Sequence, residues 1–85
     1  MENYRIDIKP SAENDLGKLP AHDRRRIISK IYTLAADPRS HGCEKLTAHN
    51  SYRVRQGVYR VVYEIDDRAK VVTVAKIAHR KEAYR

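Results

Sequence analysis

The chain has 85 residues, which limits it to one domain with a small core, because a chain of this size buries only about 60% of its unfolded surface. Its 18 Lys and Arg against 11 Asp and Glu give a net charge of +7, which favours nucleic acid or an acidic protein as a partner. A single cysteine excludes an internal disulfide, and no segment has the pattern of a signal peptide or a membrane span, so we expect a cytoplasmic protein.

The first predicted elements are a strand and a short helix. Residues 4–9 alternate apolar and polar side chains, which predicts a strand with one buried face, and Pro10 ends it. Ser11 is a plausible cap for the helix that follows. The apolar stripe of that helix consists of Ala12, Leu16 and Leu19.

A second, longer helix is predicted from Pro20 to about Asp37, just before Pro38. Apolar residues recur on one side of it at helical spacing: Ile27, Ile28, Ile31, Leu34 and Ala35. Its other side carries a run of positive charge: Arg24, Arg25, Arg26 and Lys30. Such a run can grip nucleic acid, but it lacks interleaved aromatic residues, so the favoured interpretation is a solvated helix face.

Residues 39–50 are polar and lack periodicity, which indicates a connecting loop. His41, Cys43 and His49 fall within nine residues of one another, yet their spacing matches no common zinc pattern and no fourth ligand is evident. We therefore interpret this segment as a polar surface loop without a metal.

The stretch 51–65 predicts a β-hairpin, with Arg53, Arg55 and Arg60 on one face and tyrosines and valines on the other. A two-residue turn at Gln56 and Gly57 would place Arg53 directly opposite Arg60. Like charges in that position are unfavourable, so the arginines are predicted to bind an anion, with phosphate the obvious candidate. The alternative is an ordinary solvated basic face.

A last strand is predicted over 71–78, where β-branched residues are frequent. Its even-numbered residues carry the charge and extend to Arg80, so we assign them to the basic face: Val72, Val74, Lys76 and Ala78. The predicted fold is α+β, in the order β-α-α-β-β-β, with an antiparallel sheet covered on one face by two helices. The other face stays open to solvent.

Over essentially its whole length the chain resembles the RelE/ParE superfamily of toxins from type II toxin–antitoxin pairs. The resemblance rests on Leu46, then YRVR at 52–55, YRVVYEID at 59–66 and AHRKEAYR at 78–85. The RelE-like branch typically cleaves messenger RNA inside the ribosome, whereas the ParE-like branch poisons DNA gyrase. A shared fold cannot choose between the two.

The resemblance also implies a set of site residues. The paired basic positions match Arg53 and Arg55, the phosphate-gripping arginine matches Arg60, the late basic residue matches Arg80, and the terminal tyrosine matches Tyr84. The implied RNA-binding set is Arg53, Arg55, Arg60, Lys76, Arg80 and Lys81. The gyrase branch commonly lacks this set of residues, so their presence favours the RelE-like mRNA interferase branch.

The reaction that the resemblance implies is attack of an RNA 2′-hydroxyl on its adjacent phosphate, which leaves a cyclic phosphate and a free 5′-hydroxyl without any metal or cofactor. The arginines would stabilise the transition-state charge, and Tyr84 is a candidate base if they favour its phenolate form. His79 is a candidate acid because histidine is the side chain most often used in general acid catalysis, but it is one residue out of phase with Arg80 along the strand.

The implied partners are a cognate antitoxin, the ribosome with its mRNA, and operator DNA bound by the toxin–antitoxin complex, with no membrane. Two alternatives stay open: a gyrase-directed protein binder, which needs a surface but no proton-transfer groups, and an inactive member that binds only its partner and DNA.

Overall fold

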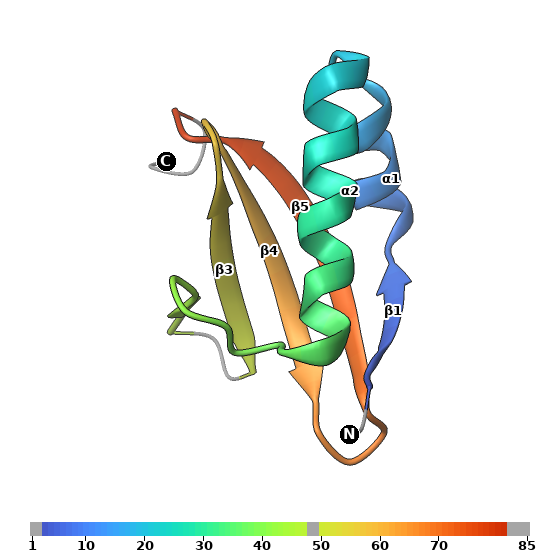
Figure 1. Cartoon of the computed structure of the whole chain (residues 1–85), viewed down its shortest axis with the longest axis vertical. Coiled ribbons are helices and arrows are strands. Elements are labelled where there is room, and N and C mark those ends of the chain that lie inside the picture. The colour runs from blue at the N-terminus through green and yellow to red at the C-terminus, as the bar shows by residue number, and fades with distance from the viewer. Residues whose placement is uncertain (1–2, 48–49, 82–85) are drawn as a thin grey trace.

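The computed structural model describes residues 3–47 and 50–81. Two helices pack on one face of a single five-stranded sheet, and no described helix covers the other face (Figure 1). The elements in chain order are β1 (Arg5–Ile8), α1 (Pro10–Gly17), α2 (Ala21–Ala36), β2 (Glu44–Lys45), β3 (Ser51–Gln56), β4 (Tyr59–Asp66) and β5 (Val71–His79). The predicted α+β class is confirmed.

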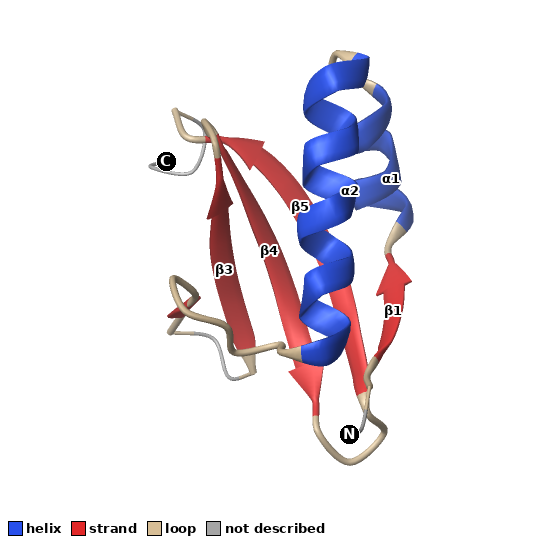
Figure 2. Ribbon diagram, viewed as in Figure 1, coloured by secondary structure: helices blue, strands red, loops and turns tan. Residues whose placement is uncertain are grey.

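The sheet has the strand order β1-β5-β4-β3-β2, and its pairs are antiparallel except for β1 beside β5, which is parallel (Figure 2). The parallel pair arises because the two helices carry the chain back along the sheet before the meander begins. Within the described residues, neither helix is long and apolar enough to cross a membrane.

Helix α2 forms one wall of the core, and its ends lie within a residue of the predicted ones. Ile27, Ile31 and Leu34 have no exposed surface. Their spacing places them on one side of the helix, where they pack against apolar side chains of the sheet such as Val61 and Val74. This packing fixes which side of α2 faces solvent.

Helix α1 begins at Pro10, and the prediction that Ser11 caps it is wrong. Proline suits the first helical position because the backbone N–H it lacks would have no partner there. Ser11 instead donates its hydroxyl to the Ala75 carbonyl at 2.9 Å, and the Asp15 carboxylate accepts from the Ile77 N–H at 3.0 Å. These contacts satisfy the backbone of β5 beyond the point where β1 ends.

The predicted hairpin turn is wrong by one residue. The turn residues are Gly57 and Val58, and Gly57 has φ +61°, as the first central residue of a type II′ turn requires. Gln56 stays in β3, so Arg60 lies opposite Arg55 instead of Arg53. The partner shifts by two residues, and every side chain therefore keeps its predicted face.

A β-bulge changes the phase of β5. The pairing moves from Val62 with Lys76 to Tyr63 with Val74, which leaves Ala75 without a partner on β4. Val74 is therefore fully buried on the helix side, as Val72 is, and their assignment to the basic face is wrong. After the bulge the assignment holds, because Lys76 shares the open face with Val62.

The segment 39–50, predicted as a loop, contains the two-residue strand β2, which pairs Glu44 with Arg53. Its start is tied to the sheet. Arg39 donates to both carboxylate oxygens of Asp67, at 3.1 and 2.8 Å, and its guanidinium lies 5.3 Å from the centre of the Tyr52 ring. These contacts hold the beginning of the segment from which Glu44 reaches the open face.

Candidate functional site

The open face of the sheet carries a pocket of about 270 Å³ at the end where β3 and β4 meet the hairpin turn. Its lining residues come from the β2 segment, β3 and β4: Gly42, Glu44, Arg53, Arg55 and Arg60. Strand alternation brings the three arginines to the same face, and we call this pocket the arginine pocket.

Arg60 is the most buried charged residue of the arginine pocket, with only 4% of its surface exposed. On its two sides lie its cross-strand partners, Arg55 on β3 and Ala78 on β5. Arg55 is exposed, so a fixed, buried guanidinium lies beside an accessible one. Two arginines directly opposite each other repel, and an anion bound between them removes that cost.

Arg53 and Glu44 form an ion pair across the β2–β3 ladder, with 3.2 Å between the Arg53 Nη2 and Glu44 Oε2 atoms. The Arg53 Nε atom is buried and has no hydrogen-bond partner in the part of the chain that the structure describes. The Glu44 side chain is 59% exposed. Its carboxylate is therefore reachable by a ligand that enters the pocket.

Glu44 is a pocket residue that the sequence did not indicate. Arginine stays protonated in proteins, so of the five lining residues Glu44 alone has a side chain that can accept a proton. It belongs to a segment without periodicity, nine residues before Arg53. Only the pairing of a two-residue strand brings it to the arginines, and such a strand leaves no pattern in the sequence.

Three further predicted RNA-binding residues lie outside the lining of the arginine pocket. Lys76 is exposed on the open face and pairs with Val62, which is two residues along β4 from Arg60. Arg80 and Lys81 are exposed just after β5, and the Arg80 N–H donates to the Val58 carbonyl at 2.7 Å. That bond fastens the end of β5 to the hairpin turn.

His79 lies on the helix side of the sheet, as the strand phase predicts. It pairs with Tyr59 across the ladder, and the two rings meet edge to face at 5.6 Å. Its Nδ1 atom accepts from the Lys81 N–H at 3.2 Å. The structure therefore does not bring His79 together with the three arginines, and Tyr84 lies outside the described residues.

Tyr59 shows the same separation of the two faces. Its hydroxyl donates to the Asp23 carboxylate of α2 at 3.3 Å. Burial, together with the charge of that carboxylate, raises the pKa of the Tyr59 hydroxyl above its ordinary value. Tyr59 thus stays protonated at neutral pH and serves as a link between β4 and α2.

In the described ranges no three His, Cys, Asp or Glu side chains are grouped so as to hold a metal ion. His41 and Cys43 belong to those ranges, whereas His49 lies outside them.

Comparison with known proteins identifies the family. A family model described as the ParE toxin of the type II toxin-antitoxin system, parDE, matches residues 6–84. The toxin RelG of Mycobacterium tuberculosis (strain ATCC 25618 / H37Rv) is 27% identical over 84 residues, which span 96% of this chain and 97% of RelG. The chain therefore belongs to the ParE toxin family of type II toxin–antitoxin systems.

Solved structures agree. The archaeal RelE–RelB complex from Pyrococcus horikoshii OT3 contains a chain that matches with a TM-score of 0.83 and 28% identity, over 92% of this chain and 96% of that one. A chain of the toxin–antitoxin complex RelBE2 from Mycobacterium tuberculosis matches with a TM-score of 0.82 and 25% identity, over 91% and 98%. The family model carries the ParE name and these relatives carry RelE-type names, so the names do not choose between the two branches.

Proposed function

We propose that this toxin is a ribosome-dependent endoribonuclease that cleaves mRNA by 2′-hydroxyl transesterification and so inhibits translation. The observation that carries the proposal is the arginine pocket, where three guanidinium groups and one accessible carboxylate converge on the uncovered face of the sheet. A protein that only binds gyrase needs no such grouping of charge.

The pocket suits the charge that develops in this reaction. Attack of the 2′-oxygen places extra negative charge on the non-bridging oxygens of the phosphorus centre, and arginine donates to such oxygens in a fixed fork. Arg60 would hold the phosphate from below and Arg55 from the solvent side. Loss of one preorganised donor of this kind commonly costs about 10² to 10³ in rate.

Proton transfer needs a base for the 2′-hydroxyl and an acid for the departing 5′-oxygen. Glu44 and Tyr84 are our two candidates for the base. We keep His79 as a candidate acid only if the end of β5 turns it toward the open face, since regular pleating directs it to the helices. A ribosome that holds the mRNA in a reactive geometry would compensate for a modest set of proton-transfer groups.

We also propose a cognate antitoxin as partner, since the Pyrococcus horikoshii relative was solved as a RelE–RelB complex. The antitoxin would inhibit cleavage by covering the arginine pocket or by displacing the carboxy-terminal segment. The excess of positive charge favours an acidic contact segment, and the complex would be the form that binds operator DNA.

The test is a reconstituted translation reaction in which mRNA ends are mapped by primer extension, beside the same RNA without ribosomes. We expect cleavage only with ribosomes, and a loss of about 10²-fold for Arg55→Gln. Arg55 is exposed, so this variant should fold, and circular dichroism would check it. Arg68→Gln, an exposed arginine in the β4–β5 turn, is the matched control and should cleave like the wild type.

The alternative function is inhibition of DNA gyrase, the activity that the family resemblance assigns to its ParE-like branch, and the family model that matches this chain carries the ParE name. A supercoiling assay run in parallel separates the two functions. Intact mRNA together with blocked supercoiling would overturn the nuclease proposal and assign the protein to the gyrase branch.

A further inference from the structure

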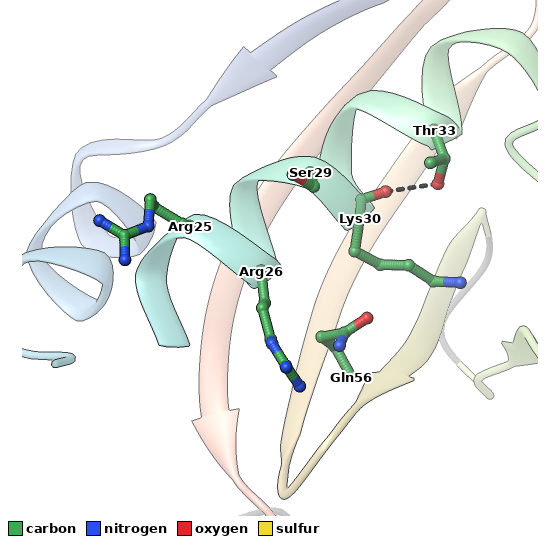
Figure 3. Close-up of a pocket in the computed structure, with 6 residues that line it drawn as sticks. All are labelled: Arg25, Arg26, Ser29, Lys30, Thr33 and Gln56. Atoms are coloured by element: carbon green, nitrogen blue, oxygen red, sulfur yellow. Dashed lines mark hydrogen bonds between the residues drawn. The ribbon is translucent and has the colours of Figure 1, made fainter. Parts of the chain in front are cut away.

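A second basic pocket, of about 430 Å³, lies on the other side of the sheet, between α2 and the end of β3 (Figure 3). It is lined by Arg25, Arg26, Ser29, Lys30, Thr33 and Gln56. In Figure 3 the side chains of Arg26 and Lys30 extend from the helix toward Gln56, while Arg25 points away from it. We call this site the α2 pocket.

The α2 pocket and the arginine pocket face opposite ways. Gln56 and Arg55 are neighbours in β3, so their side chains point to opposite faces of the sheet. The buried side of α2, with Ile27 and Ile31, fixes the helix against the sheet, so its basic side faces outward. One short RNA strand in the arginine pocket therefore does not reach the α2 pocket across the same face.

Every side chain that lines the α2 pocket can donate a hydrogen bond, and none carries a carboxylate. Three arginines elsewhere in the chain form ion pairs: Arg5 with Asp7, Arg39 with Asp67 and Arg53 with Glu44. The three cations of the α2 pocket make no ion pair with any described residue. Arg26 and Lys30, one helical turn apart, instead repel each other.

Arg24, which belongs to the same run in the sequence, has a different task. Its Nη2 atom donates to the Leu19 carbonyl at 2.9 Å, which ties the start of α2 to the end of the α1 segment. Arg24 thus makes a structural contact, whereas Arg25, Arg26 and Lys30 form no ion pair within the described residues. The sequence favoured the interpretation that this helix face is only solvated. That interpretation does not explain why Gln56, from β3, lines the same pocket as the cations of α2.

The composition of the lining indicates what would bind. Protein interfaces centre on aromatic or large apolar anchors, and the α2 pocket has none. Single-stranded nucleic acid is held by stacking on aromatic side chains, which the lining also lacks. Double-helical RNA, in contrast, is recognised through its phosphates and 2′-hydroxyls by Arg, Lys, Ser, Thr and Gln side chains.

We propose that the α2 pocket binds the phosphate backbone of double-helical RNA, as a second RNA contact on the face opposite the arginine pocket. The proposal rests on the proposed function, because a toxin that acts on the ribosome meets folded RNA there. The two contacts would let the protein hold the mRNA on one face and structured RNA on the other.

The test is the fluorescence anisotropy of a labelled RNA hairpin, with a stem of about 16 base pairs, titrated with the full chain. Arg25→Gln, Arg26→Gln and Lys30→Gln are combined in one variant. Lys9→Gln, Lys18→Gln and Arg68→Gln, all exposed and outside both pockets, are combined in a control with the same net charge. Thermal unfolding checks that both variants fold.

We expect the α2 variant to bind the hairpin at least about tenfold more weakly than the control, because it has lost its contacts with RNA phosphates. Each lost phosphate contact should also lower the slope of log affinity against log salt by about one unit. A slope lowered by about three in the α2 variant alone supports the site. Equal losses in the two variants would mean non-specific attraction by net charge, and would overturn it. The proposal would also be overturned if the α2 variant bound the hairpin normally but bound an acidic antitoxin segment more weakly. The α2 pocket would then be a protein contact.

The readout separates this inference from the proposed function, because hairpin binding requires no cleavage. If the hairpin binds through α2 but the wild-type chain leaves mRNA intact on ribosomes, the α2 site is supported and the nuclease proposal is overturned. If the α2 variant cleaves mRNA and binds the hairpin like the control, the nuclease proposal is supported and the α2 site is overturned.

Discussion

Asp67 joins three parts of the chain through one carboxylate. Its Oδ1 atom accepts from the Tyr4 hydroxyl at 2.6 Å, and Arg39 donates to both of its oxygens. The hydrogen bonds from Arg39, then the one from Tyr4, lower the pKa of Asp67 to about 2. The end of the β4 hairpin is thereby held to the amino-terminal strand and to the segment after α2.

This pKa predicts how stability depends on pH. A carboxyl group whose pKa is lower in the folded state stabilises the fold above the unfolded pKa of about 3.9, and that contribution disappears as pH falls toward the folded value. Asp67→Asn should therefore unfold at lower urea than the wild type at pH 7, with the difference shrinking between about pH 4 and pH 2. Both partners are partly exposed, so the effect should be modest. Glu13→Gln, an exposed acid of α1, is the control, and a difference that stays constant with pH would contradict the prediction.

Glu44 allows a second prediction at this scale. If its carboxylate accepts the 2′-hydroxyl proton, Glu44→Gln should lower the cleavage rate on ribosomes by about 10² or more, because general-base catalysis typically contributes 10² to 10⁴. RNA binding should stay the same or tighten, since a negative charge leaves the arginine pocket. Glu64 lies in β4 on the open face of the sheet, outside the arginine pocket, so Glu64→Gln should leave the cleavage rate unchanged. An active Glu44→Gln variant would leave Tyr84 as the candidate base.

Tyr63 gives a third residue-scale prediction, this time on stability. It is fully buried, its ring stacks on Tyr52 with 5.9 Å between centres, and its hydroxyl donates to the Pro38 carbonyl at 2.7 Å. Burial raises the pKa of Tyr63 far above its ordinary value. Tyr63→Phe keeps the ring and leaves the Pro38 carbonyl unpaired, so urea unfolding should show a loss of about 1 to 3 kcal/mol. A loss near zero would mean that water or a shifted donor replaces the hydroxyl.

At the scale of elements, α1 supports β5 where the sheet would otherwise have an open edge. The parallel pairing with β1 ends at Val74, and beyond it Ser11 and Asp15 of α1 bond to the backbone of β5. The same stretch contains the bulge at Ala75, which returns Lys76 to the open face. Helix α1 thus stabilises the part of β5 that flanks Arg60.

The role of Asp15 can be measured directly. Asp15→Ala would leave the Ile77 N–H without its partner, and urea unfolding should show a loss of about 1 to 3 kcal/mol. Asn14→Ala, an exposed neighbour in the same helix, is the control and should change stability by less than about 0.5 kcal/mol. Equal losses in the two variants would show that the helix, and not this hydrogen bond, is being weakened.

The elements also show what periodicity can and cannot predict. The stripe of Ile27, Ile31 and Leu34 predicted α2 to within a residue, and the alternation of the hairpin predicted its buried face. The predicted turn was wrong by one residue because Gln56-Gly57 and Gly57-Val58 both place a glycine in a two-residue loop, and only the observed pairing of Gln56 with Tyr59 decides between them. The predicted faces of Val72 and Val74 in β5 were wrong because a bulge adds one residue to the strand, and an apolar, β-branched sequence gives no signal of it.

At the scale of the whole molecule, the two faces of the sheet divide the work. One face is buried under the helices and holds the core, while the other carries buried Arg60, half-buried Arg53 and exposed Arg55 beside the Glu44 carboxylate. Alternation within β3 and β4 predicted the grouping of Arg53, Arg55 and Arg60, because those three depend only on strand parity. The approach of Glu44 depends on the path of residues 39–47, and the α2 pocket depends on where β3 ends relative to α2, so neither follows from a local pattern.

This division predicts that single-stranded RNA should stabilise the folded chain through the arginine pocket. A 2′-O-methyl mRNA fragment lacks the attacking hydroxyl and stays intact, and at 100 times its Kd it should add about 2.7 kcal/mol to the free energy of unfolding. For a domain of this size that raises Tm by roughly 10 to 20 °C, which differential scanning fluorimetry can follow. The rise should largely vanish in Arg55→Gln and persist in the α2 variant, because only the first alters the open face. No rise at the highest fragment concentration would mean that the free toxin lacks this RNA site, and the gyrase alternative would then gain weight.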